Sequence, residues 1–134
     1  MNDFIHYFFK ENKQLINDEA YEVVDDFGGC DDSFYNCQMI ISNNKLDVLL
    51  TRDKAQFLID VKSCSMGKEE WVSLGILNHI ISGSKDFDEM LDGRSITYFG
   101  SHYSEICAFF EQKIDIIRKK VSSAKIKRAR YLFG

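Results

Sequence analysis

Three short apolar segments in the middle of the chain, at 34–41, 46–50 and 57–62, constrain the fold more than any other feature. Two polar segments, 42–45 and 51–54, separate them. Both contain Asn or Asp, residues that tolerate the left-handed backbone conformations required by tight turns between antiparallel strands. The sequence therefore predicts an antiparallel β-meander in which each strand pairs with the next.

Alternation within these segments predicts a sheet with one apolar and one polar face. If the second turn is centred on Asp53 and Lys54, then Asp47 lies opposite Asp60. The apolar face is formed by Leu46, Val48, Leu50, Phe57, Ile59 and Val61, continued by Tyr35, Cys37, Met39 and Ile41. The opposite face carries Asp47, Thr51, Gln56, Asp60 and Lys62, with Leu49 and Leu58 as its apolar members. Helices are expected to cover only the apolar face.

Helical periodicity flanks the meander on both sides. Apolar residues recur at three and four positions in 2–17 and 68–81, with Gly83 placed to end the second helix. Ser101 can cap a long final helix, whereas 84–100 lacks a regular pattern. From Ser122 onward we expect a continuation of that helix or a fraying basic tail.

These elements predict a single α+β domain over 1–134, with a basic C-terminal tail at 122–134. The domain is expected to be an antiparallel β-meander covered on one face by three or four helices. A chain of 134 residues is long enough to bury a self-sufficient core.

Charge is distributed unevenly along this chain, whose net charge is −4. The part up to residue 63 contains 12 acidic and 6 basic residues, and the rest contains 9 acidic and 11 basic residues. Seven carboxylates and no cation lie between 18 and 32, whereas 113–130 is strongly basic. Such a separation can steer a partner of opposite charge, although solvated loops and helix ends produce it too.

The cysteines fit no CxxC pattern of a metal or redox site. They are Cys30, Cys37, Cys64 and Cys107. The first ten residues show no secretion leader, and no apolar run approaches the ~20 residues of a membrane span. We therefore expect reduced thiols, a cytoplasmic protein, no membrane contact and no metal or other cofactor.

Asp47, Asp60 and Lys62 form the one pattern that predicts catalysis. An acidic residue followed across a hairpin by Asp-x-Lys resembles the core of the PD-(D/E)xK nucleases. In the register above, the two carboxylates could share a Mg²⁺ ion, and Lys62 could stabilise developing charge. The resemblance covers about 16 residues, without a proline before Asp47 or a Gln-bearing helix afterwards. The alternative is a hairpin with alternating polar residues on its solvent side.

A second resemblance covers about half of the chain. The hairpin NNKLDVLLTRDKAQFLIDVKS at 43–63 precedes the helix-like segment WVSLGILNHIISG at 71–83 and a long closing helix with basic residues. This order is similar to that of small bacterial immunity proteins, including those of contact-dependent growth inhibition and related polymorphic toxin systems. The resemblance implies a stoichiometric, non-enzymatic inhibitor that caps a cognate toxin domain in the cytoplasm of the producing cell.

The acidic region is the predicted toxin-facing surface. Many such toxins are nucleases with cationic substrate grooves, which an acidic inhibitor can occupy as a phosphate mimic. The candidate toxin-binding residues are Glu22, Asp25, Asp26, Asp31, Asp32 and Tyr35. Tyr21, Phe27 and Phe34 are candidate aromatic anchors, with core packing as the alternative for each. No direct contact with nucleic acid is expected, and an interaction domain without a toxin partner is a third hypothesis.

Overall fold

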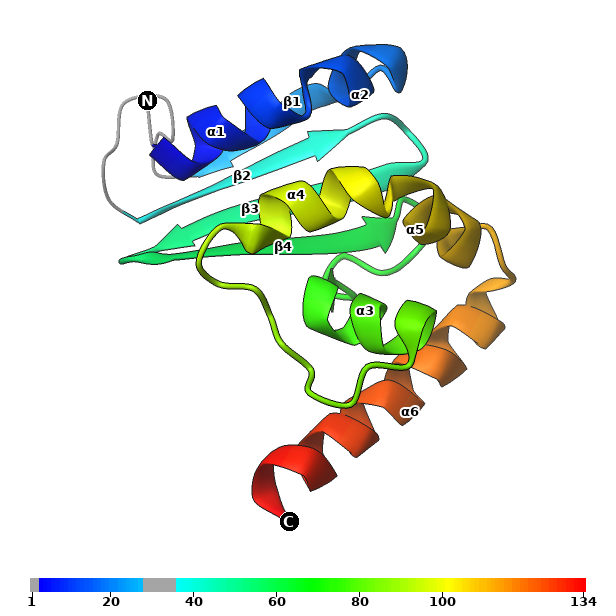
Figure 1. Cartoon of the computed structure of the whole chain (residues 1–134). Coiled ribbons are helices and arrows are strands. Elements are labelled where there is room, and N and C mark those ends of the chain that lie inside the picture. The colour runs from blue at the N-terminus through cyan, green and yellow to red at the C-terminus, as the bar shows by residue number, and fades with distance from the viewer. Residues whose placement is uncertain (1–2, 28–35) are drawn as a thin grey trace.

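The computed structural model describes residues 3–27 and 36–134, which form an α+β fold around a five-stranded antiparallel sheet (Figure 1). The strands are β1 (Glu22–Phe27), β2 (Cys37–Ser42), β3 (Leu46–Asp53), β4 (Gln56–Ser63) and β5 (Val72–Ser73), in that spatial order. The helices are α1 (Asp3–Glu11), α2 (Lys13–Asp18), α3 (Leu74–Ser82), α4 (Arg94–Ser101), α5 (Tyr103–Phe110) and α6 (Ile114–Phe133). The predicted fold class and the meander β2–β3–β4 are confirmed.

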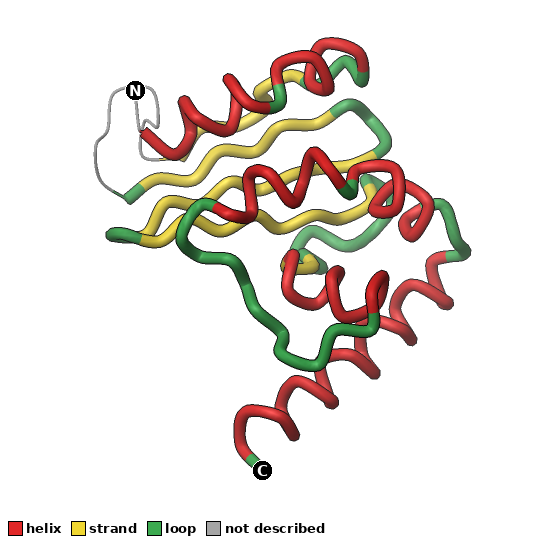
Figure 2. The backbone as a smooth tube through the Cα atoms, viewed as in Figure 1, coloured by secondary structure: helices red, strands yellow, loops and turns green. Residues whose placement is uncertain are grey.

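The core lies between the apolar face of the meander and the helices that cover it. Figures 1 and 2 show α1 and α4 crossing one face of the sheet, while α3 and α6 pack near the β4–β5 edge. Phe57 on β4 is fully buried and stacks on Phe4 of α1, with 5.4 Å between ring centroids. Phe8 of α1 and Phe99 of α4 are also fully buried and touch each other. Strand alternation therefore identified the buried face correctly.

The register of the β3–β4 hairpin differs from the prediction by two residues. Asp47 pairs with Lys62, and Asp60 pairs with Leu49, because the turn lies at Lys54 and Ala55. Lys54 adopts a left-handed backbone (φ 55°), and its N–H donates to Asn36 Oδ1 at 2.6 Å. A shift by two preserves side-chain alternation, so the buried face is right although the predicted Asp47–Asp60 pair is wrong.

The helix predicted over 68–81 begins later, at Leu74. Val72 and Ser73 form β5 instead and pair with Val61 and Asp60 of β4. Ser73 then caps α3, because its Oγ accepts a hydrogen bond from the N–H of Ile76. Gly83 ends this helix in a left-handed conformation (φ 73°), as predicted.

The final helix begins later than expected, and Ser101, which was predicted to cap it, is instead the last residue of α4. Helix α4 occupies 94–101, within the segment predicted as largely irregular, and α5 ends at Phe110. Lys113 is extended (ψ 141°) and separates α5 from α6. Helix α6 continues to Phe133, so the basic segment 122–134 is almost entirely helical, one of the two alternatives predicted for it.

The first predicted helix is divided at Asn12 into α1 and α2. Asn12 is buried, and its side-chain amide donates to the carbonyl oxygens of Phe8 and Ile96. These bonds attach the end of α1 to α4, which explains why a polar residue lies inside the helical layer.

We expect Phe57→Ala to lower the free energy of unfolding by about 3–5 kcal/mol, because it leaves a cavity beneath α1. Phe133→Ala is the matched control, since Phe133 is 87% exposed, and it should change stability by less than about 0.5 kcal/mol. Urea denaturation followed by circular dichroism measures both values. Equal effects of the two substitutions would contradict the described core.

Candidate functional site

Strand β1 carries the described part of the predicted toxin-binding surface. Glu22, Asp25 and Asp26 all lie in this strand. The other predicted members, Asp31, Asp32 and Tyr35, lie outside the described residues, as does Phe34. Sequence alternation does not indicate a strand at 22–27, because a β-bulge at Val24 interrupts the alternation of apolar and polar residues.

Strand β1 is exposed on both of its faces as well as at the edge of the sheet. Its one neighbour in the described sheet is β2, to which it is antiparallel. Val23, Val24 and Phe27 are 51%, 59% and 49% exposed, so both faces of the strand present apolar side chains to water. An edge strand of this kind can accept a strand from another protein through its backbone groups.

The carboxylates of β1 give this edge a negative charge. Glu22 and Asp25 are exposed, and neither takes part in the ion pairs found among the described residues. Asp25 Oδ1 accepts a hydrogen bond from the backbone N–H of Asp26 at 2.9 Å. The strand therefore combines acidic side chains with three exposed apolar ones, a composition suited to a cationic protein partner.

Of the aromatic residues near this strand, Tyr21 belongs to the core. It is 7% exposed, and its hydroxyl lies 2.8 Å from that of Tyr103. Burial raises the pKa of Tyr21, against the opposing effect of the hydrogen bond with Tyr103. Phe27 is the described aromatic residue of the acidic region that remains available for an interface.

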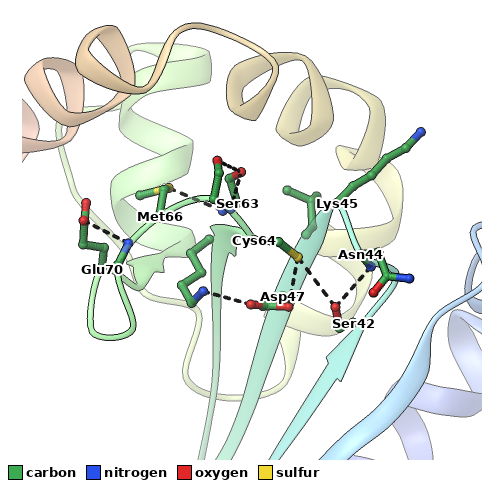
Figure 3. A network of polar contacts seen from close by, with 12 residues as sticks. Ser42, Asn44, Lys45, Asp47, Ser63, Cys64, Met66 and Glu70 are labelled. Carbon is green, nitrogen blue, oxygen red and sulfur yellow. Dashed lines mark hydrogen bonds and ion pairs between the residues drawn. The ribbon is translucent and has the colours of Figure 1, made fainter.

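Asp47 and Lys62 form an ion pair at one end of the meander (Figure 3). Lys62 is buried, its Nζ lies 2.9 Å from Asp47 Oδ2, and it faces the ring of Trp71. Cys64 Sγ donates to the other carboxylate oxygen at 3.2 Å. Partial burial alone would raise the pKa of Asp47, but hydrogen bonds from Lys62, Ser42 and Cys64 lower it below its usual value. Both oxygens of this carboxylate are thus engaged inside the protein.

Asp60 belongs to a different cluster. It is half-buried beside Glu89, and burial together with the nearby charge of Glu89 raises its pKa to about 6. Glu89 accepts hydrogen bonds from Ser73 Oγ and from the N–H of Gly75 at the start of α3. It also pairs with Arg128 of α6 at 3.3 Å.

The residues of the nuclease-like pattern are divided between these two clusters: Asp47 and Lys62 lie in one, and Asp60 lies in the other. Lys62 neutralises Asp47 directly, while the carboxylate that influences Asp60 is Glu89. In the part of the chain that the structure describes, no group of three His, Cys, Asp or Glu side chains is arranged to hold a metal ion. The juxtaposition of Asp47 and Asp60, on which the pattern depended, is therefore not found.

Among the cysteines that the structure describes, one departs from the prediction of reduced thiols. Cys37, at the start of β2, is disulfide-bonded, whereas Cys64 and Cys107 are free. Burial raises the pKa of both free thiols, and for Cys64 the adjacent Asp47 carboxylate adds to this effect. A raised pKa keeps these thiols protonated and poorly nucleophilic.

Comparison with protein-family models, curated proteins and solved structures finds no match to this chain. Among the described helices, none has the length and apolar character needed to cross a bilayer.

We expect Asp60→Asn to stabilise the protein by about 1–3 kcal/mol at pH 7.5. Because the pKa of Asp60 is raised to about 6 by folding, the native state binds more protons than the unfolded state between about pH 4 and 6. Stability from this group is present at low pH and is lost as pH rises through that window. The variant should remove this loss, as measured by urea denaturation at several pH values.

Asp47→Asn is the paired variant, and we expect it to destabilise the protein instead of stabilising it. It leaves the buried ammonium of Lys62 without its ion pair and should cost about 2–3 kcal/mol at pH 7.5. A destabilising Asp60→Asn with an unchanged pH dependence would contradict the described environment of Asp60.

Proposed function

We propose that this chain is an immunity protein that binds and neutralises a cognate bacterial toxin domain without catalysing a reaction. The exposed acidic edge strand β1 is the observation that carries the proposal. Its features suit protein recognition, because the backbone of an edge strand can pair with a partner strand while its side chains supply charge and apolar contact.

The proposed partner surface is cationic. Glu22 and Asp25 project from this edge, and neither carboxylate forms an ion pair with a described cation. A toxin that acts on nucleic acid needs a positive substrate groove, so a nuclease domain is the class of toxin that fits best. Carboxylates at the centre of such a groove would exclude the phosphates of the substrate.

Val23, Val24 and Phe27 would supply the apolar part of this interface. Each is about half exposed in the isolated chain and would lose contact with water in the complex. Charge would then set mainly the rate of association, while apolar burial and strand pairing would slow dissociation.

The proposed location is the cytoplasm of the producing cell, and the disulfide of Cys37 bears on it. Cytoplasmic thiols are normally kept reduced. A cytoplasmic location therefore requires that the disulfide of Cys37 persist there, which the 5% exposure of Cys37 favours because cellular thiols reach a buried sulfur slowly.

Replacing Glu22 and Asp25 together by Lys should slow association with the cognate toxin domain by about tenfold or more at low salt. The toxin domain to use is the variable C-terminal domain of a large secreted protein encoded next to this chain. Stopped-flow fluorescence at several salt concentrations measures the rate, and the difference should shrink above about 0.15 M salt.

The matched control replaces Glu11 and Glu105 by Lys, which changes the net charge by the same amount on exposed helical positions. This control should retain most of the wild-type association rate. Equal slowing in both double variants would show that only net charge matters, and an unchanged rate in the β1 variant would exclude this surface.

The rival hypothesis of a PD-(D/E)xK nuclease lacks a comparable observation, since Asp47 is bound to Lys62 and Asp60 lies beside Glu89. It requires Mg²⁺-dependent cleavage of DNA or RNA that Asp60→Ala abolishes. Detection of that activity would replace the present proposal.

A further inference from the structure

A second surface, opposite in charge to β1, lies on the far side of the molecule. An open groove of about 970 Å³ runs between α3, the loop that follows it, and α6. Strand β1 is at one edge of the sheet, whereas α6 packs on α3 near the opposite edge (Figure 1). One molecule could therefore use both surfaces at the same time.

The floor of this groove is apolar and partly aromatic. Ile80 of α3 and Ile116 and Ala124 of α6 line it. His79 stacks on Phe87 with 4.5 Å between ring centroids, and Phe87 in turn lies 6.0 Å from the ring of Tyr131. His79 Nδ1 also lies 2.6 Å from the carbonyl oxygen of Ser84, which fixes the imidazole as part of the wall.

The rim of the groove is cationic. Four lysines line it, and no Asp or Glu occurs among its lining residues. The lysines are Lys85, Lys119, Lys120 and Lys127. Lys120 donates to Gln112 Oε1, while Lys119 and Lys127 stand two helical turns apart on α6, about 12 Å along its axis.

The positions of the lysines favour one class of anionic ligand over the others. A lipid with a single anionic head needs cations at one end of the groove, whereas these lysines are spread along its length. Single-stranded nucleic acid needs free aromatic faces for its bases, but His79 and Phe87 already stack on each other. Several carboxylates spaced along an apolar stripe match both the rim and the floor.

We infer that this groove binds an acidic amphipathic helix of a partner protein. The lining residues of α6 extend from Ile116 to Tyr131, about 22 Å, which is the length of a helix of about 15 residues. Apolar side chains of the bound helix occupy the floor, and its flanking carboxylates pair with Lys85, Lys119 and Lys127. This inference does not depend on the proposed toxin contact at β1.

The test uses a fluorescein-labelled synthetic helical peptide of about 15 residues, with leucines along one stripe and glutamates on both sides of it. Fluorescence anisotropy should show saturable binding that weakens as salt is added. Two control peptides should not bind: one with lysine in place of every glutamate, and one with the same composition but the leucine stripe scrambled.

Lys119→Glu combined with Lys127→Glu should weaken binding of this peptide at least tenfold. The matched control is Lys113→Glu combined with Lys125→Glu, which gives the same net charge from positions outside this groove. Ser123→Trp, at an exposed position on the groove lining, should block the floor and abolish binding while circular dichroism stays unchanged.

Absence of peptide binding, or equal loss in the two double variants, would overturn the inference. So would displacement of the peptide by laurate or by oligothymidylate, tested as unlabelled competitors at equal concentration, because either result would assign the groove to a different class of ligand.

Discussion

The packing of the apolar face of β2, β3 and β4 against α1 and α4 is the constraint on which the remaining structure depends. Phe57 illustrates it, because one buried ring fixes β4 beneath α1. Since alternate side chains of a strand must face opposite ways, this packing also determines which polar groups lie on the other face. Asp47, Asp60 and Lys62 are there for that reason, and their local pairing follows from the position of one turn.

The sequence was sufficient to predict the meander, its buried face and the α+β class, because those features depend on alternation that is visible in Leu46, Val48 and Leu50. It was not sufficient for the hairpin register. The turn at Lys54 and Ala55 depends on a contact with Asn36, far away in the sequence. The start of α3 was missed for a similar reason, since Val72 and Ser73 pair with β4 before the helix begins.

For the candidate sites too, local sequence predicted some features, while others depend on contacts between distant segments. Charge counting located the acidic region, but neither the strand conformation of Glu22 and Asp25 nor the exposure of Phe27 can be deduced from composition when a bulge disrupts the alternation. The cluster of Asp60 with Glu89 joins segments distant in the chain and has no local sequence signal. The lysine-rimmed groove likewise requires the packing of α6 on α3.

The protein is thus a scaffold with two exposed surfaces of opposite charge, and the acidic strand β1 is the proposed toxin-binding surface. Hydrogen–deuterium exchange of the complex with the cognate toxin domain tests this claim most directly, because it reports on the backbone of β1 itself. The account predicts slower exchange at 22–27 in the complex than in the free chain. Unchanged exchange there, with protection confined to other segments, would contradict it.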